Sequence, residues 1–158
     1  MRRYPFGVAV ATVEVDGNRL GLTVSSLASL ALEPPLVGLS IWRQAAFHEL
    51  LREAGGFAVS LLAGDQLELA QHFSRGVPPI AMWHGLAVRE SDRGPLLEGA
   101  VGWLECELDA EHEAGDHTLY LGRVEHLHSR PGEALLFHRG AFGRVSPEEQ
   151  VPAHSWGW

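Results

Sequence analysis

The sequence has no lysine and only one cysteine, Cys106, among its 158 residues. The absence of lysine excludes Schiff-base chemistry and a P-loop, in which a lysine binds the phosphates of the nucleotide. A single cysteine excludes an internal disulfide and a cysteine-rich metal site, and it indicates a reducing compartment. We therefore expect a cytoplasmic protein in which Cys106, flanked by alternating apolar and acidic residues, lies in a core as a small apolar side chain.

Long apolar runs and an excess of positive charge are also missing. Glycine, proline or a charged residue interrupts every apolar stretch before it reaches the roughly 18 residues that a membrane-spanning helix needs. Twelve arginines face 20 aspartates and glutamates, which gives a formal net charge of -8. Proteins that bind nucleic acids use basic patches to displace counterions from phosphates. The sequence therefore predicts neither a membrane nor a nucleic acid as a partner.

The remaining composition is that of an ordinary globular chain, with 46% hydrophobic and 20% charged residues. A chain of this length can bury a core without disulfides or a structural metal. No internal repeat and no linker is visible. We expect one domain over residues 1–145, followed by an irregular tail over residues 146–158 that contains two prolines and two tryptophans.

The spacing of apolar residues predicts many short strands. Residues 7–15 and 19–25 are expected to form two strands joined by the hairpin turn Asp16–Gly17. A loop is expected next, and a buried strand at residues 36–41 follows the prolines of Glu33-Pro34-Pro35. Further strands are predicted at residues 57–62, 85–90, 96–111, 118–128 and 134–139.

Two short helices are predicted within this series of strands. Apolar residues at helical spacing before Gly55–Gly56 indicate a helix over residues 45–54. Asp65 and Glu68 resemble an N-cap and its reciprocal acid, which predicts a second helix over residues 66–73. This order of elements favours a mainly antiparallel sheet closed into a barrel over a βαβ fold.

The stretch from Gly21 to Leu30 is the most informative for chemistry, because it places four hydroxyl groups among apolar residues at the end of a strand. Hydroxyls and loop amides in such a place can hold a phosphate or a polyol chain. A serine-rich turn capped by its own side chains explains the same pattern equally well. A second candidate is Phe73-Ser74-Arg75, where an arginine at a helix end can bind a phosphate with its forked guanidinium or can simply be solvated.

The nine histidines raise the question of a metal site or a titrating group. His117 stands in a turn after Gly115–Asp116, where it can donate a hydrogen bond to a ligand or serve a structural role. His126 and His128 share one face of a strand, but a third ligand at fixed spacing is missing, so we predict no metal site. Motifs of a serine hydrolase elbow and of a dinucleotide-binding glycine loop are absent.

Several segments resemble, in order, the sequence pattern of the flavin reductase-like family, the FMN-binding split barrels. The most specific is the run over residues 21–37, Gly-Leu-Thr-Val-Ser-Ser-Leu-Ala-Ser-Leu-Ala-Leu-Glu-Pro-Pro-Leu-Val. The other matching segments are Phe57–Leu62, Gln66 with Leu69–Ala70 and Phe73–Arg75, Gly115–Val124, and Leu135–Gly140 with Phe142–Gly143. Together they cover nearly the whole chain up to about Arg144, and their common order makes the resemblance specific.

The resemblance implies a six-stranded antiparallel split β-barrel with short flanking helices, working as a homodimer. It implies a reductase of FMN or FAD that uses NADH or NADPH, moves hydride from the nicotinamide to N5 of the flavin, and serves a monooxygenase component. By position it implies that His117 acts at the nicotinamide as the catalytic residue. The residues that it implies for cofactor binding are Thr23, Val24, Ser25, Ser26, Ser29, Arg43, Phe73, Arg75, Gly115 and Asp116.

This sequence departs from the family pattern in two places. Relatives have a hydroxyl-rich run after the third strand, whereas residues 42–47 are Trp-Arg-Gln-Ala-Ala-Phe, in which Arg43 alone keeps a phosphate-binding group. Relatives also have more of a leading helix, and a threonine at the position of Phe6. The missing hydroxyls leave an alternative open, a split-barrel protein that binds flavin or heme without turnover.

Overall fold

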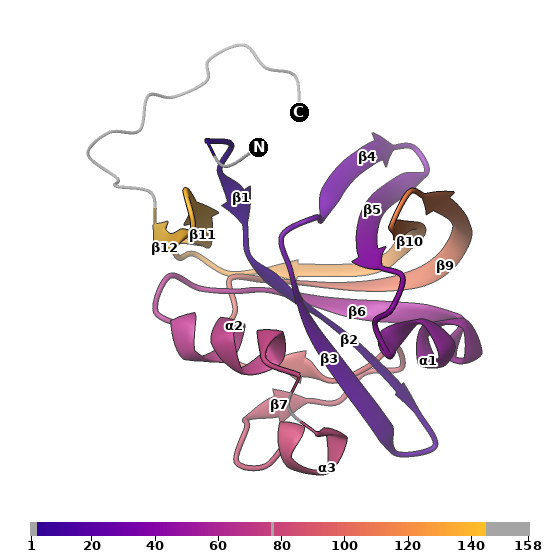
Figure 1. Cartoon of the computed structure of the whole chain (residues 1–158), viewed down its shortest axis with the longest axis horizontal. Helices are drawn as coiled ribbons and strands as arrows, with labels where there is room; N and C mark the ends of the chain where they lie inside the picture. The colour runs from indigo at the N-terminus through magenta and orange to yellow at the C-terminus, as the bar shows by residue number, and fades with distance from the viewer. Residues whose placement is uncertain (1–2, 77, 145–158) are drawn as a thin grey trace.

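The computed structural model describes residues 3–76 and 78–144, and the chain folds into a mainly β structure with a few short helices (Figure 1). The tail expected over residues 146–158 lies outside the described residues. The strands are β1 (Phe6–Gly7), β2 (Ala9–Val15), β3 (Asn18–Val24), β4 (Ala28–Leu32), β5 (Pro35–Trp42), β6 (Gly56–Leu61), β7 (Val88–Arg89), β8 (Leu96–Leu97), β9 (Gly102–Ala114), β10 (His117–Ser129), β11 (Leu135–His138) and β12 (Ala141–Arg144). The helices are α1 (Phe47–Ala54), α2 (Leu67–Ser74) and α3 (Pro79–Met82).

The main sheet has seven strands in the order β3-β2-β6-β9-β10-β5-β4, and every neighbouring pair is antiparallel. The mainly antiparallel architecture was predicted, but the sheet has one strand more than expected. The additional strand is β4, in the segment that was expected to be a loop. The turn at Glu33–Pro34 folds these residues back onto β5, so the prolines form a hairpin rather than a break.

Two smaller sheets lie beside the main one. The first contains β1, β11 and β12, and the second contains only β7 and β8. The predicted strand 85–90 is therefore reduced to Val88–Arg89, and the predicted strand 96–111 is divided into β8 and β9. Backbone hydrogen bonds from Glu98 to Ala87 and from Val101 to Leu61 explain this division, because they direct the connecting residues toward different strands.

Strands β2 and β6 are covered on both faces, which explains why the segment Val8–Val13 is buried without alternation. One face contributes Ala11 and Val59 to a core cluster shared with α1 and the β9–β10 hairpin. The other face contributes Val10 to a second cluster that includes Phe73 of α2 and Met82 of α3. Figure 1 shows α2 and α3 on the same side of this sheet and α1 at its other end.

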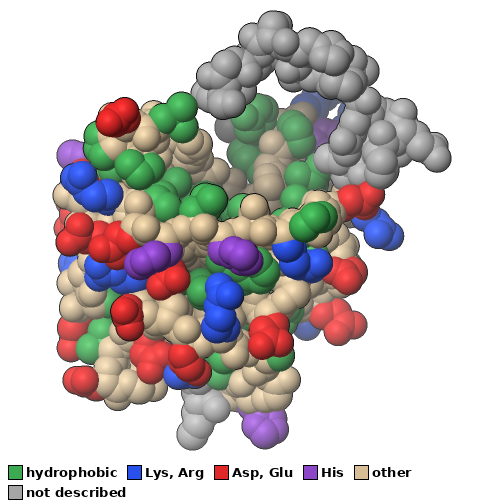
Figure 2. All heavy atoms as spheres, turned by 180° about the vertical axis from the view of Figure 1, so that it is seen from behind, with side chains coloured by type: hydrophobic (Ala, Val, Ile, Leu, Met, Phe, Trp, Pro, Cys, Tyr) green, Lys and Arg blue, Asp and Glu red, His purple; other side chains and the backbone are tan. Residues whose placement is uncertain are grey.

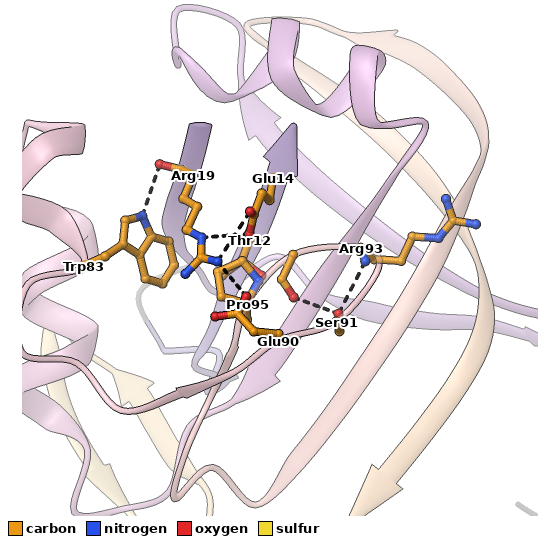
Figure 3. Close-up of polar contacts among 9 residues, drawn as sticks. Thr12, Glu14, Arg19, Trp83, Glu90, Ser91, Arg93 and Pro95 are labelled. Atoms are coloured by element: carbon orange, nitrogen blue, oxygen red, sulfur yellow. Dashed lines mark hydrogen bonds and ion pairs between the residues drawn. The ribbon is translucent and has the colours of Figure 1, made fainter. Parts of the chain in front are cut away.

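Polar contacts fasten the connection after α3 to the β2–β3 hairpin (Figure 3). The buried Thr12 hydroxyl donates to the carbonyl of Pro95 at 2.9 Å, and the indole N–H of Trp83 donates to the carbonyl of Arg19 at 3.1 Å. The Arg19 guanidinium pairs with Glu14 at 2.7 Å and with Glu90 at 2.6 Å. Trp83 also packs against the second core cluster.

The two longest strands, β9 and β10, form a hairpin whose register shifts at Leu121/Gly122 and at Val124/His126. The first shift changes the face on which the residues of β9 lie. Cys106 is fully buried as predicted, and burial raises the pKa of its thiol to about 12. Beyond the shift, Glu111 and Glu113 pair with Tyr120 and Thr118, so these two carboxylates lie on the side of the sheet that faces α1.

The start of α2 differs from the prediction. Asp65 is not the N-cap, and the residue in that position is Gln66, whose side-chain oxygen instead accepts the backbone N–H of Ala63 at 2.9 Å. The amide group of Gln66 donates to the carbonyl of Glu98 at 2.7 Å. Gln66 therefore joins three segments, and the helix begins one residue later than the expected cap would place it.

Gly122 provides a test of the packing between β10 and β6. A Cβ atom at this position would lie 2.6 Å from Cζ of Phe57 and 3.0 Å from Cβ of Cys106, and both of these side chains are fully buried. We predict that Gly122→Ala lowers the free energy of unfolding by about 1–3 kcal/mol, because the core cannot expand to admit the methyl group. Urea denaturation measures the change.

Gly143→Ala is the matched control, since a Cβ atom there meets nothing within 4 Å. We expect the control to change stability by less than about 0.5 kcal/mol. Equal stability of the Gly122→Ala protein and the wild type would contradict the described packing.

Candidate functional site

The outer face of β5 and β10 is the first component of the site. Leu39 and Ile41 point into the core, so Gly38, Ser40 and Trp42 lie on the opposite face. The tryptophan is 51% exposed. In the antiparallel register Trp42 pairs with His117, which places the predicted histidine on this outer face beside the indole.

Apolar side chains continue this face toward β4. A Cβ atom at Gly38 would meet Leu30 at 2.9 Å and Leu119 at 3.5 Å, so these two leucines lie over the glycine backbone. Leu30 is 50% exposed, and Leu32 at the end of β4 is also exposed. Figure 2 shows hydrophobic side chains along the upper edge of the molecule, the edge at which Figure 1 places the β4–β5 hairpin. A flat apolar ligand could bind on this exposed apolar surface and displace the solvent from it.

The turn between β9 and β10 is the second component. Gly115 adopts a φ of 66°, a left-handed conformation that suits glycine and closes the hairpin tightly. The Nδ1–H of His117 donates to the Asp116 carboxylate at 2.7 Å, and this hydrogen bond lowers the pKa of the Asp116 carboxyl. The backbone N–H of Arg43 donates to the carbonyl of Asp116 at 2.9 Å. The turn is thereby attached to the corner that follows β5.

The serine-rich loop is the third component, and its hydroxyls divide into two groups. The Ser26 hydroxyl donates to the carbonyl of Ser40 at 2.7 Å and accepts the N–H of the same residue at 3.2 Å, while the Thr23 hydroxyl donates to the carbonyl of Ala70 at 2.7 Å. These two groups hold the loop against β5 and α2. The other two predicted hydroxyls, those of Ser25 and Ser29, belong to exposed residues.

Val24 and the end of α2 complete the set of predicted residues. Val24 is buried in the first core cluster, and Phe73 is buried in the second, where its ring lies 5.1 Å from that of Trp83. Arg75 is exposed at the end of the helix and donates to the Gln71 side chain at 3.1 Å. The bond from Thr23 to Ala70 brings this helix next to the serine-rich loop.

A cavity of about 450 Å³ lies between α1 and the β9–β10 hairpin. Charged side chains line it, and Arg43 pairs with Glu113 at 3.2 Å while Arg52 pairs with Glu111 at 2.9 Å. Thr118 also lines the cavity, and Thr118 points to the opposite face of β10 from His117. The side chain of Arg43 is therefore directed away from the outer face that carries the histidine.

The structure thus brings Arg43, Asp116 and His117 together at one corner, and Ser26 reaches β5 only two residues before that corner. Arg75 lies on a separate element. Trp42 and the buried His48 also belong to this corner, and neither was predicted there from the sequence. Exposure of a tryptophan and burial of a histidine depend on pairing with distant strands, and no local pattern signalled either.

In the described part of the chain, no three histidine, cysteine, aspartate or glutamate side chains gather as metal ligands would. Within residues 3–76 and 78–144, no helix has the length and apolar character needed to span a bilayer.

Comparison with known proteins identifies the family. The family model described as a flavin reductase like domain matches residues 1–146. The chain belongs to the flavin reductase-like family. It is 38% identical over 144 residues to a flavin reductase of Pseudomonas putida, covering 89% of this chain and 84% of that protein. It is 32% identical over 152 residues to the reductase subunit of a flavin-dependent monooxygenase from Mycobacterium tuberculosis, covering 94% and 80% of the two chains.

Solved structures of the flavin reductase-like family agree with the fold described here. The NADH:FAD oxidoreductase of Streptomyces globisporus C-1027 superimposes with a TM-score of 0.86 at 36% identity, covering 92% of this chain and 89% of that chain. The predicted resemblance is therefore confirmed.

Proposed function

We propose that the protein is a flavin reductase that oxidises NADH or NADPH and reduces FMN or FAD. The observation that carries this proposal is the match to the flavin reductase-like family over residues 1–146. Relatives at 32–38% identity carry the names of NADH-dependent reductases of flavin, FMN or FAD. When bound, a flavin would supply the chemistry as the acceptor, at N5, of hydride from the nicotinamide, and the protein would contribute binding, orientation and exclusion of water.

The outer face of β5 and β10 fits the ring system of a flavin. Trp42 and Leu30 each expose about half of their surface there, and Leu30 and Leu119 cover the backbone of the buried Gly38. An apolar aromatic ring that covers this face removes apolar surface from water at roughly 25 cal/mol per Å². We assign this face to the isoalloxazine ring.

The serine-rich loop fits the ribityl chain and the phosphate. Ser25 and Ser29 expose their hydroxyls, while the bonds of Thr23 and Ser26 hold the loop in position. Arg75 offers the positive charge, since the described bond of its guanidinium is to the neutral side-chain amide of Gln71. Arg43 is less available, because Glu113 already neutralises it. Val24 and Phe73 contribute through packing beneath the loop and α2.

His117 is assigned to the nicotinamide. Its Nδ1–H is held by Asp116, so the neutral ring presents Nε2 as an acceptor for the carboxamide N–H group of a nicotinamide. Gly115 gives the turn the conformation that sets this orientation. Hydride transfer needs no proton from the protein, so the role of His117 is to place the nicotinamide ring against the flavin.

The same proposal includes the barrel architecture, the domain bounds, the cellular location and the partner of the protein. The six strands of the main sheet other than β4 form a split barrel, and the bonds between Ser26 and Ser40 close the gap between the end of β3 and β5. Residues 1–145 form the reductase domain and residues 146–158 its tail. The protein is cytoplasmic, and it delivers reduced flavin to a monooxygenase, as the name of the mycobacterial relative suggests.

We further propose a homodimer in which the apolar outer face around Leu30 and Leu32 is shared between two subunits. Stable dimers of this kind bury upwards of about 2,000 Å², which makes the monomer a minor species at ordinary concentrations. We predict that light scattering gives the mass of two chains. A monomer that binds flavin with full affinity would overturn the shared site.

The proposed activity is tested with purified protein. We predict that NADH or NADPH is oxidised only when FMN or FAD is added or already bound, and absorbance at 340 nm follows the reaction. The alternative function, storage of flavin or heme without turnover, is favoured by the missing hydroxyls after Trp42. Tight flavin or heme binding without nicotinamide oxidation would establish that alternative and end the proposed activity.

The role of His117 is tested by His117→Ala. We predict that flavin affinity and thermal stability stay near those of the wild type, while kcat/KM for NADH or NADPH falls by up to about 10²-fold, because the ring loses its positioning contact. His126→Ala serves as the matched control, since His126 is an exposed histidine toward the other end of β10. Loss of flavin or a markedly lower melting temperature in His117→Ala would make the histidine a structural or flavin-binding residue.

The serine-rich loop is tested by the double variant Ser25→Ala/Ser29→Ala. Each hydrogen bond to a charged phosphate contributes about 1.5–3 kcal/mol, and two such losses are not fully additive. We therefore predict flavin binding weaker by several kcal/mol at most, with unchanged folding, measured by titration of flavin fluorescence. Ser91→Ala, in the distant loop of Figure 3, is the control. Unchanged FMN affinity in the double variant would mean that these two hydroxyls do not bind the phosphate.

A further inference from the structure

His48 is a buried histidine of α1 whose two ring nitrogens both have partners. Nδ1 lies 2.5 Å from the hydroxyl of Tyr120, and Nε2 lies 2.8 Å from the carbonyl oxygen of Trp42. A carbonyl oxygen can only accept, so Nε2 carries the hydrogen. In the neutral ring Nδ1 is then an acceptor, and the Tyr120 hydroxyl donates to it. Burial raises the pKa of Tyr120, which keeps that hydroxyl protonated.

The carbonyl group of Trp42 connects the hydrogen-bonded pair of His48 and Tyr120 to the candidate site. The same oxygen accepts the backbone N–H of Ala45 at 2.9 Å. The next residue, Arg43, donates its N–H to the carbonyl of Asp116 at 2.9 Å, and the Asp116 carboxylate holds His117. Hydrogen bonds therefore link the fully buried Tyr120 to the exposed turn, joined covalently through the Trp42–Arg43 peptide and through Asp116, whose backbone carbonyl and carboxylate make separate bonds.

His48 lies on the buried side of α1. Phe47 and Leu51, its neighbours on the buried side of α1, pack in the first core cluster, where an apolar residue would be the ordinary choice. A buried polar side chain stabilises a structure only when its partners satisfy it, and it then selects one arrangement of those partners. The arrangement selected here is that of the corner Trp42–Ala45.

We infer that His48 is a positioning residue, held by Tyr120, which fixes the corner after β5 and through it the turn that carries His117. The inference rests on the proposed function, because it assigns the corner a role in nicotinamide placement. His48 itself does not contact the outer face, since it lies on the α1 side of the sheet with Thr118. Its effect on the reaction therefore passes through the backbone of Trp42 and Arg43.

Three variants distinguish the contributions of the two hydrogen bonds that His48 makes, one with Tyr120 and one with Trp42. His48→Phe keeps a ring of similar size and removes both bonds, whereas His48→Gln returns an N–H group near the position of Nε2. Tyr120→Phe removes only the bond to Nδ1. Thr12→Val is the matched control, because it removes another buried bond from a side chain to a backbone carbonyl, that to Pro95 in Figure 3, away from the corner.

Steady-state kinetics at saturating flavin give the first measurement. We expect His48→Phe to lower kcat/KM for the nicotinamide at least about tenfold without changing flavin affinity, because a small displacement of the reacting groups is costly. His48→Gln should recover most of that loss, and Thr12→Val should lose stability without losing kcat/KM. Wild-type kinetics in a folded His48→Phe protein, or a His48→Gln protein no better than it, would overturn the inference.

Amide hydrogen exchange gives a measurement that does not depend on activity. The N–H groups of Arg43 and Ala45 should exchange at least about tenfold faster in His48→Phe than in the wild type, with recovery in His48→Gln and smaller changes in Tyr120→Phe. If His48→Phe does not fold, Tyr120→Phe and His48→Gln decide the question by the same two amides. A wild-type protein without reductase activity would refute the proposed function, while unchanged exchange in the variants would refute the role of His48.

Discussion

The register between β5 and β10 is the constraint on which the rest of the site depends. It sets His117 opposite Trp42 and Tyr120 opposite Leu39. Tyr120 and Leu39 are both fully buried, and side chains of a strand alternate between its faces. A shift by one residue would turn the tyrosine to solvent and the histidine toward the core, so burial of these core residues also orients the outer face that carries His117.

The two faces of strands β5 and β10 differ, because one is covered by other parts of the chain and the other is left partly exposed. On one face, α1 and the core cluster cover β5 and β10, and the charged groups of Arg52 and Glu111 close the rim. The opposite face keeps Trp42 and Leu30 half exposed. Monomeric soluble proteins rarely leave such apolar surface uncovered without a ligand or a partner. We propose that a flavin and a second subunit together cover it.

Much of this fold could be predicted from local patterns. The turn Asp16–Gly17 was identified because few residue types tolerate the positive φ angles of 49° and 80° that it adopts. Helix α1 was identified from apolar spacing and from the glycine that ends it. Strand β4 was missed because Pro34 suggested a break, whereas the prolines in fact form a hairpin turn.

The site was predicted only in part, for a different reason. The turn at His117 and the serine-rich loop carry motifs that a sequence displays directly. The bond between His48 and Tyr120 joins residues 72 positions apart, and no spacing rule connects them. The exposure of Trp42 follows from strand pairing, and the pairing of Arg43 with Glu113 follows from the register shift in β9. Such features become visible only once the sheet has been assembled.

The central claim is that a flavin binds on the outer face of β5 and β10. Mapping of backbone amide chemical shifts by NMR during titration with FMN tests it most directly. The account predicts that the shifts concentrate at Trp42 and Arg43, at residues 115–117 and at residues 25–29. Shifts confined instead to α3 and the β7–β8 hairpin, with no change at Trp42 or His117, would contradict it.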